Sequence, residues 1–318
     1  MIIVPFNTLI GKKVKGNSKT FLQSLRTNYW LYLLLLPGLV YLFIFNYIPM
    51  GGIVIAFQDF RITRGFLGSD WVGLRHFRYL FDSPVFFRVL RNSLWLSFLR
   101  MVWGFPMPII LAVMMNEMLK HKYKRFMQTV LYLPHFISWV IVFGIVQNFL
   151  SPSTGIINLL IMQGGGTPVH FFTNPSLFRP MIVLTDIWKN AGWGTIIYMA
   201  AISGIDAEMY EAAIIDGASR FQRIRFITIP AISGTIVVML VLRLGGIMAN
   251  GFEQLFLFQN ALTLGVGEVF ETYTYRVGLL EGRFSFAAAV GIFNSAVSFI
   301  MLFSTNFIAR RIKGGGLW

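Results

Sequence analysis

Residues 206–230 read DAEMYEAAIIDGASRFQRIRFITIP, a polar stretch that stands between long apolar runs. Every residue from Ala207 to Asp216 is compatible with a helix, and Gly217 suits a helix stop. A second short, basic helix can follow before Pro230, since a proline is tolerated in the first turn of the next helix. The stretch therefore predicts a helix–turn–helix that lies along a membrane surface.

Helical spacing brings Glu208, Glu211, Ala212 and Ile215 to neighbouring rows of the first of these two helices. One face thus combines carboxylates with a small residue and an apolar residue. Such a face is suited to insertion into a groove of another protein.

The composition around this stretch is that of a membrane protein. Hydrophobic residues make up 56% of the 318 residues and charged residues 13%, whereas a soluble domain is about 45–50% apolar and about 25% charged. We expect the net charge of +14 to set membrane topology, and we expect no nucleic-acid partner. The chain has no cysteine, which excludes disulfides, thiolate metal sites and thiol nucleophiles.

We predict an all-α integral membrane protein with six transmembrane helices, because a helix needs about 20 apolar residues to cross a bilayer. Three stretches lack Asp, Glu, Lys and Arg: Thr27–Gln58, Phe126–Phe178 and Phe284–Ala309, of which the second leaves room for a loop after its span. Three further spans tolerate charge, at about residues 89–115, 181–203 and 229–250.

The distribution of Lys and Arg outside these spans predicts cytoplasmic N and C termini. The two tails and the loops 116–125 and 204–228 together hold more basic residues than the remaining loops. The expected organisation is a cytoplasmic segment over residues 1–28, a membrane domain over 29–309 that includes the loop 204–228, and a cytoplasmic tail over 310–318.

The first external loop, residues 58–88, is an exception to this distribution because it is rich in arginine (Arg61, Arg64, Arg75, Arg78 and Arg88). These arginines can pair with the acidic residues of the same loop, with lipid phosphates or with a partner protein. Alternatively, they attract an anionic substrate. The sequence leaves these alternatives open.

No motif of an enzyme is present. The Gly11-Lys12 pair lacks the upstream glycine and the following hydroxyl of a phosphate-binding loop, so we expect no ATP hydrolysis by this chain. The histidines are too dispersed for a metal-ligand spacing, and no nucleophile elbow occurs. The sequence predicts neither a catalytic residue nor a metal site.

The polar stretch resembles the signature loop of ATP-binding-cassette importer permeases: Glu211-Ala212-Ala213, three residues, Gly217, nine residues, then Ile227-Thr228-Ile229-Pro230. The departure is Ile229, where leucine is more usual. Further motifs resemble the oligosaccharide and polysaccharide permeases related to the maltose system: Tyr47-Ile48-Pro49-Met50-Gly51-Gly52, Trp71-Val72-Gly73-Leu74, Tyr132-Leu133-Pro134-His135-Phe136-Ile137-Ser138-Trp139 and Gly155-Ile156-Ile157-Asn158. Within that group the chain looks most like the first permease subunit of bacterial alginate importers.

The resemblance implies a multi-pass transport subunit of the bacterial cytoplasmic (inner) membrane, not an enzyme. Its implied partners are a second permease in a heterodimer, two cytoplasmic ATPase subunits that carry ATP and Mg, an extracytoplasmic substrate-binding protein, a saccharide and membrane lipid. No cofactor is implied in this chain. The implied ATPase-coupling residues are Glu208, Glu211, Ala212, Ala213, Gly217, Arg220 and Phe221.

Polar residues inside the expected spans are the second functional signal, because a charge at the bilayer centre costs at least ~2.5 kcal/mol. Asp186 and Lys189 either neutralise each other on one helix face or line a sugar path, where aromatic and amide groups suit the CH faces and hydroxyls of a saccharide. Arg91 and Arg100 can add charge that attracts anions, or Arg91 can snorkel. The predicted path residues are Asp186, Trp188, Lys189, Asn190, Trp193, Arg243 and Asn250.

The predicted function is import of oligo- or polysaccharides, acidic and alginate-like, from a binding protein to the cytoplasm by alternating access. An importer of neutral oligosaccharides is an alternative. An ion-coupled secondary transporter with Asp186 as the titrating group is another, although no inverted repeat is detected. A membrane enzyme acting on lipid-linked sugars would need convergent carboxylates or histidines, and the sequence does not assemble such a cluster.

Overall fold

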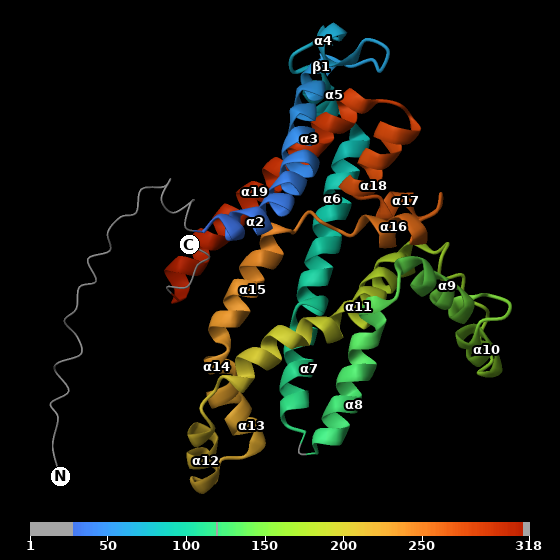
Figure 1. Ribbon diagram of the computed structural model, residues 1–318. Helices are drawn as coiled ribbons and strands as arrows, with labels where there is room; N and C mark the ends of the chain where they lie inside the picture. The colour runs from blue at the N-terminus through green and yellow to red at the C-terminus, as the bar shows by residue number, and fades with distance from the viewer. Residues whose placement is uncertain (1–27, 119, 314–318) are drawn as a thin grey trace. The chain divides into compact units, whose positions relative to one another are not determined.

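The computed structural model describes residues 28–118 and 120–313, and almost all of its regular structure is helical (Figure 1). This confirms the predicted all-α class. The exception is a short antiparallel ribbon in which β1 (Gln58–Asp59) pairs with β2 (Asp70–Trp71). Most of the expected tail segments 1–28 and 310–318 lies outside the described residues. The chain divides into two units at Val54 and Ile55, and each unit is described by itself.

The first unit is one run of helix that starts at Tyr29. It comprises α2 (Tyr29–Leu42), η2 (Phe43–Tyr47), α3 (Ile48–Met50) and the start of η3 (Gly51–Phe57). The run from Tyr29 to Phe57 has a mean hydropathy of 2.0 and is long and apolar enough to cross a membrane. It coincides with the first expected span.

The second unit contains the remaining helices. In chain order they are α4 (Gly65–Gly68), α5 (Arg75–Asp82), α6 (Pro84–Leu99), η4 (Arg100–Gly104), α7 (Pro106–Asn116), α8 (His121–Tyr132), η5 (Leu133–Phe136), α9 (Trp139–Leu150), α10 (Ile156–Gln163), α11 (Pro175–Ser203), α12 (Ala207–Ile215), α13 (Arg220–Arg223), η6 (Ile224–Thr228), α14 (Ile229–Ala231), α15 (Ser233–Gly245), α16 (Phe252–Phe258), α17 (Leu264–Gly267), α18 (Phe270–Tyr275), η7 (Arg276–Leu280) and α19 (Phe284–Lys313).

Long helices form the frame of this unit. The run α6–η4–α7 is continuous over 33 residues, and α11 packs along α7 while α15 packs along α19. Figure 1 shows α12, α13 and the α7–α8 connection at one end of the unit, with α5 and the ribbon at the opposite end. The polar stretch of residues 206–230 is therefore far from the arginine-rich loop.

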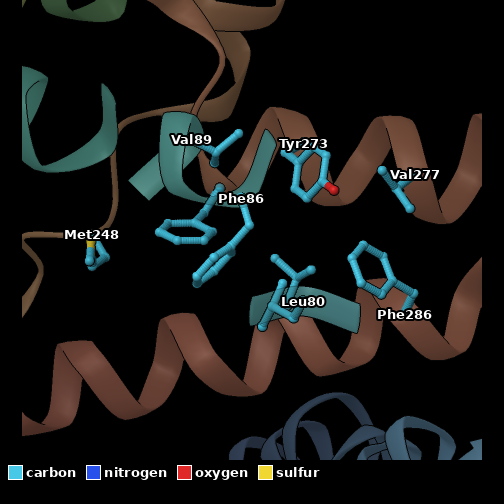
Figure 2. Packing of buried hydrophobic residues seen from close by; sticks show 9 residues of the cluster. Leu80, Phe86, Val89, Met248, Tyr273, Val277 and Phe286 are labelled. Atoms are coloured by element: carbon cyan, nitrogen blue, oxygen red, sulfur yellow. The ribbon is translucent and has the colours of Figure 1, made fainter. Parts of the chain in front are cut away.

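An aromatic cluster fills the space where α5, α6, α18 and α19 meet. Figure 2 shows Leu80 between Phe86 and Phe286, with Tyr273 and Val277 from the neighbouring helix. All five side chains are buried. Burying such side chains away from water stabilises each by about 1.5–3 kcal/mol, so this cluster holds the ribbon end of the unit together.

Two expected spans are bent rather than straight. Residues His121–Phe136 and Trp139–Leu150 form helices at 103° to each other, and Arg220–Ala231 and Ser233–Gly245 meet at 60°. The expected span at residues 229–250 also ends early, because helix α15 stops at Gly245 instead of continuing to Asn250. The first bend lies at Ile137 and Ser138, where extended backbone (ψ of 134° and 153°) ends η5 and precedes α9.

The number of spans depends on how the bent pairs are counted. Among the described residues, three helices are long and apolar enough to cross a membrane, or five if each bent pair is one span. Helix α11, the remaining expected span, has 29 residues and carries charges. Several membrane-spanning helices are thus present, while the count of six and the cytoplasmic termini stay predictions.

Candidate functional site

Asp186 on α11 has a partner on a different helix. Its Oδ2 lies 3.9 Å from the Nε of Arg100 on η4, and its Oδ1 accepts a hydrogen bond from the Nδ2 of Asn190, 2.8 Å away. The expectation that Asp186 and Lys189 neutralise each other is therefore wrong. Although three residues apart on one helix, the two side chains bind to different parts of the protein.

Lys189 is buried and reaches the bend between α8 and α9. Its Nζ donates to the carbonyl oxygens of Pro134 (3.3 Å), His135 (2.8 Å) and Ile137. The last carbonyls of a helix have no partner within the helix and attract cations. Lys189 therefore supplies donors to backbone carbonyls at the bend, and it is not among the residues that line the cleft described next.

A cleft of about 350 Å³ opens between η4, α7, α11 and α15. Asp186, Asn190 and Arg243 contribute its polar side chains, while Phe105 and Tyr198 belong to the more apolar wall. Three of the predicted path residues are thus brought together from helices that lie far apart in the sequence. The size falls in the range of about 300–1,000 Å³ that is usual for small-molecule sites.

The two predicted tryptophans lie outside this cleft. Trp188 and Trp193 are 48% and 43% exposed. Trp193 stacks on His135 with ring centroids 4.7 Å apart, and the Nδ1 of His135 lies 3.1 Å from the Oδ1 of Asn190. Trp193 is therefore connected to the cleft through His135, a residue that was not among the predicted path residues.

Asn250 is fully buried and organises the irregular segment after α15. Its Oδ1 accepts from the hydroxyl of Ser97, 3.0 Å away, and its backbone N–H donates to Glu271 Oε1, 2.7 Å away. Its carbonyl oxygen accepts from Arg100. Asn250 thus holds backbone in place; it is not among the residues that line the cleft, but it lines a smaller pocket together with Arg100 and Arg243.

Arg100 is the centre of a buried polar network. Besides contacting Asp186, its guanidinium donates to Asn250 O and to the Oε1 of Gln254. The Nε2 of Gln254 in turn donates to the carbonyl of Ile182 (2.9 Å) and the hydroxyl of Thr185 (2.8 Å). The charge of Arg100 is therefore compensated inside the protein, and the expectation that it attracts an external anion is wrong.

The sequence interpretation missed Gln254 and Glu271. Both lie between the last two expected spans, in residues 251–283, where the structure has helices α16 and α18. The sequence feature that could have indicated them is the occurrence of single polar residues within apolar segments, such as FEQLFLF at residues 252–258. A buried amide in such a segment needs partners, and those partners are the residues of α11.

Most of the arginines at the ribbon end are paired with carboxylates. Asp59 lies 3.8 Å from Arg61 and 3.4 Å from Arg75, and Asp70 lies 3.0 Å from Arg64. Glu268 similarly binds Arg88 and Arg276, at 3.3 and 2.7 Å. Of the alternatives for this loop, pairing with its own acidic residues is thus confirmed for Arg61, Arg64 and Arg75, whereas Arg88 pairs with Glu268 outside the loop.

Arg243 differs from these arginines. It is exposed in the cleft, and in the described part of the chain no carboxylate lies within ion-pair distance of it. The carboxylate that shares the cleft, Asp186, is bound to Arg100. The cleft therefore presents an uncompensated guanidinium beside an amide group, Asn190.

The helix–turn–helix of the polar stretch is built from local caps. The Asp206 carboxylate accepts from the N–H of Glu208, 3.0 Å away, and begins α12. At the other end Gly217 has φ = 76°, and the N–H groups of Gly217 and Ala218 close the helix on Ile214 O and Ala213 O. Such a turn requires the left-handed conformation that glycine adopts without strain.

The second helix of this stretch, α13, begins with a capping box in which Ser219 and Gln222 exchange hydrogen bonds. The hydroxyl of Tyr210 on α12 contacts that of Thr228, 2.9 Å away, which ties α12 to η6, the helix that follows α13. The predicted helix–turn–helix is confirmed as a local structure.

The predicted coupling residues lie mostly on the surface of these two helices. Ala213 is half-buried, while the other six are exposed: Glu208, Glu211, Ala212, Gly217, Arg220 and Phe221. Apolar side chains are exposed beside them, with Ile215 at 85% and Phe221 at 75%. Within the described residues neither Glu208 nor Glu211 has an ion-pair partner. The surface thus combines free carboxylates with bare apolar groups.

The family described as binding-protein-dependent transport system inner membrane component matches residues 104–314 of this chain. The chain belongs to this family. Its permeases are transport subunits rather than enzymes, and the ATPase of such systems is a separate subunit. The recognition from the Glu211-Ala212-Ala213 motif is therefore confirmed, and the chain is a membrane-spanning permease of a sugar importer of the ATP-binding-cassette type.

Two relatives from Bacillus subtilis (strain 168) match this permease over nearly its whole length. Protein LplB is 47% identical over 303 residues, which are 95% of each chain. The polygalacturonan/rhamnogalacturonan transport system permease protein YteP is 45% identical over 312 residues, which are 98% of this permease and 97% of the relative.

Two crystal structures contain similar chains. One is of a bacterial ABC transporter involved in the import of the acidic polysaccharide alginate, with a TM-score of 0.85 at 43% identity, covering 92% of this permease and 99% of that chain. The other is of a bacterial alginate ABC transporter in complex with an alginate pentasaccharide-bound periplasmic protein, with a TM-score of 0.86 at 42% identity, covering 93% and 99%.

Proposed function

We propose that this permease imports acidic oligo- or polysaccharides, of the polyuronate class to which alginate belongs, and passes them to the cytoplasm by alternating access. The observation that carries the proposal is the guanidinium of Arg243, exposed in the cleft without a carboxylate partner among the described residues. Arginine binds carboxylates with two parallel hydrogen bonds, and such charge-assisted bonds are about twice as strong as neutral ones.

The remaining groups of the cleft suit the sugar that carries the carboxylate. Asn190 offers an amide next to the fixed carboxylate of Asp186, and these groups can exchange hydrogen bonds with hydroxyls. The names of the relatives favour the same class, since alginate and polygalacturonan are both polyuronates. Permeases for arabino-oligosaccharides match at 27% identity and keep neutral saccharides as the second candidate.

The proposed assembly contains a second permease, two cytoplasmic ATPase subunits with ATP and Mg, and an extracytoplasmic binding protein. In this arrangement residues 29–309 form six spans of the bacterial cytoplasmic membrane, with both termini in the cytoplasm. Support comes from the cluster of His121, Lys122, Lys124 and Arg125 at the α8 end, the end of the unit where α12 and α13 also lie (Figure 1).

The proposed contact with the ATPase is the exposed surface of α12 and α13. The free carboxylate of Glu211 meets a basic residue of the ATPase, and Ala212, Ala213 and Gly217 allow close docking. Motion of the ATPase subunits is then transmitted through this loop as rigid-body movement of the helices. The apolar side chains of Ile215 and Phe221 support this assignment because they are bare in the chain alone.

The substrate assignment is tested with the complete transporter in nanodiscs, by measuring ATPase stimulation by binding protein loaded with an oligouronate or with a neutral oligosaccharide. We expect stimulation by the oligouronate. In the Arg243→Gln variant we expect the half-saturating concentration of loaded binding protein to rise about tenfold, as loss of one charge-assisted interaction predicts. Arg243→Lys keeps the charge and should show a smaller increase.

The matched control is Arg310→Gln on α19, which removes an exposed arginine far from the cleft in the sequence. It should leave stimulation unchanged. Stimulation by the neutral saccharide alone would refute the acidic class while keeping the importer. An Arg243→Gln variant that responds like the unmodified transporter would refute the role of Arg243.

A further inference from the structure

A second cationic groove runs along α6 and shares no lining residue with the Arg243 cleft. It has a volume of about 820 Å³ and is lined by Arg91, Arg179 and an apolar wall. Arg91 is on α6, and Arg179 is in the second turn of α11. No acidic residue lines this groove.

Buried neutral acceptors fix the Arg179 guanidinium in place. Its Nε donates to the carbonyl of Val266, 3.1 Å away, and one terminal nitrogen donates to the Oδ1 of Asn92, 2.8 Å away. Asn92 is fully buried and is itself held by the carbonyls of Gly265 and Glu268. Neutral acceptors orient a guanidinium without cancelling its charge, so Arg179 presents a full positive charge in a defined position.

Arg91 adds a second positive charge to the same groove. It is exposed, and within the described residues it has no ion-pair partner. The arginines of the neighbouring ribbon end are instead paired, as the Arg64–Asp70 distance of 3.0 Å illustrates. Two like charges that share a groove repel each other, and an anion bound between them relieves that repulsion.

The apolar wall offers a flat aromatic surface. Trp95 and Phe98 are stacked with ring centroids 5.5 Å apart at an interplanar angle of 22°, and they are 47% and 51% exposed. Sugar rings pack their CH faces on such surfaces. The combination of a guanidinium pair with exposed aromatic rings therefore fits a sugar ring that carries a carboxylate.

The groove and the cleft share helix α11, which contributes Arg179 to the groove and Asp186 to the cleft. Arg179 and Asp186 are seven residues apart on α11, which is about two turns, so they lie on the same helix face about 10 Å apart along the axis. The buried network of Arg100 and Gln254 contacts α11 at Ile182, Thr185 and Asp186, between Arg179 and the cleft residue Asn190 along this helix.

We propose that Arg91 and Arg179 form an outer carboxylate subsite that receives a uronate unit before it reaches the Arg243 cleft. This rests on the proposed acidic substrate class. In this arrangement the arginine pair binds the carboxylate, and the Trp95–Phe98 surface carries the sugar ring. The Arg100 network separates the outer subsite from the inner one.

The test uses the complete transporter in phosphatidylcholine nanodiscs with binding protein loaded with an oligouronate. We expect Arg91→Gln to raise the half-saturating concentration of loaded binding protein about tenfold. Arg91→Lys, which keeps the charge, should recover most of the response. Arg91 has no hydrogen-bonded structural role among the described residues, so its substitution is less prone to misfolding than that of Arg179. Arg310→Gln again serves as the control.

Three outcomes are decisive. An unchanged oligouronate response in Arg91→Gln overturns the outer subsite, while Arg243→Gln independently reports on the proposed function. A response of the unmodified transporter to neutral saccharide alone refutes the acidic class and the subsite with it. A difference between Arg91→Gln and the unmodified transporter that appears only in nanodiscs with phosphatidylglycerol assigns the groove to a lipid phosphate and overturns the subsite.

Discussion

The ammonium group of Lys189 on α11 donates a hydrogen bond to the carbonyl oxygen of His135, 2.8 Å away, where the chain turns by 103° between η5 and α9. It also bonds to the carbonyls on either side, those of Pro134 and Ile137. One side chain thus donates to three backbone acceptors at the bend, of which the Pro134 carbonyl also accepts from the N–H of Ile137.

Replacing Lys189 by methionine should destabilise the permease by about 2–3 kcal/mol, because buried acceptors lose a charged donor. The measurement is the thermal unfolding midpoint of the purified permease in detergent. Lys122→Met on the exposed face of α8 is the control and should unfold like the unmodified protein. Equal midpoints for the two variants would show that Lys189 does not hold the bend.

Gly192 lets α8 and α11 approach closely. A Cβ at this position would lie 1.9 Å from the carbonyl oxygen of Leu131, which is backbone and cannot rotate away. We expect Gly192→Ala to cost about 1–3 kcal/mol through overpacking. Gly291→Ala on α19 is the matched control, since its Cβ meets nothing within 4 Å. Similar unfolding midpoints for both alanine variants would contradict the close approach.

Substitutions at Gly217 change the backbone conformation of the coupling loop without creating a steric clash. Its φ of 76° is strained for residues with a side chain, yet a Cβ there meets nothing within 4 Å. Gly217→Val should distort the turn and reduce ATPase stimulation by loaded binding protein at least severalfold, since left-handed backbone costs about 1–2 kcal/mol. Gly217→Asn should retain most of it, because asparagine tolerates this conformation. Equal ATPase stimulation in both variants would show that the conformation of the turn does not affect coupling to the ATPase.

His76 makes the ribbon end sensitive to pH. Its Nε2 lies 3.0 Å from the carbonyl oxygen of Gln58, and burial lowers the pKa of its imidazole below the ordinary value of about 6.5. Nearby Arg75 and Arg283 also lower the pKa, whereas the Gln58 hydrogen bond and Asp59 raise it. The net direction is downward, so the folded ribbon favours neutral His76.

Between the folded and unfolded pKa of His76, the unfolded segment binds more protons, so the free energy of unfolding decreases as the pH falls below about 6.5. Hydrogen exchange of residues 55–82, corrected for intrinsic rates, should therefore show less protection at about pH 5.5 than at about pH 7.5. His76→Gln should remove this contribution. An undiminished pH dependence in that variant would assign the effect to other groups.

The helix–turn–helix at residues 206–230 could be predicted from the sequence because its determinants are local. The caps at Asp206 and Ser219 act on backbone two or three residues away, and Gly217 acts on its own turn. The apolar helices were predictable for the same kind of reason, since the composition of each stretch fixes its preference for a bilayer.

The polar network and the bends required the three-dimensional structure. From the sequence, Asp186 has two possible partners: Lys189, three residues away, and Arg100 on another helix. The packing of α11 against η4 and α7 decides for Arg100. The bend between η5 and α9 is stabilised by the donors of Lys189, which comes from α11. The cleft around Arg243 likewise depends on which helices lie side by side, because its charge is left uncompensated only when Asp186 is bound elsewhere. Local interactions depend on neighbouring residues and can be predicted from the sequence, whereas the partner of a buried charge depends on the long-range packing of helices.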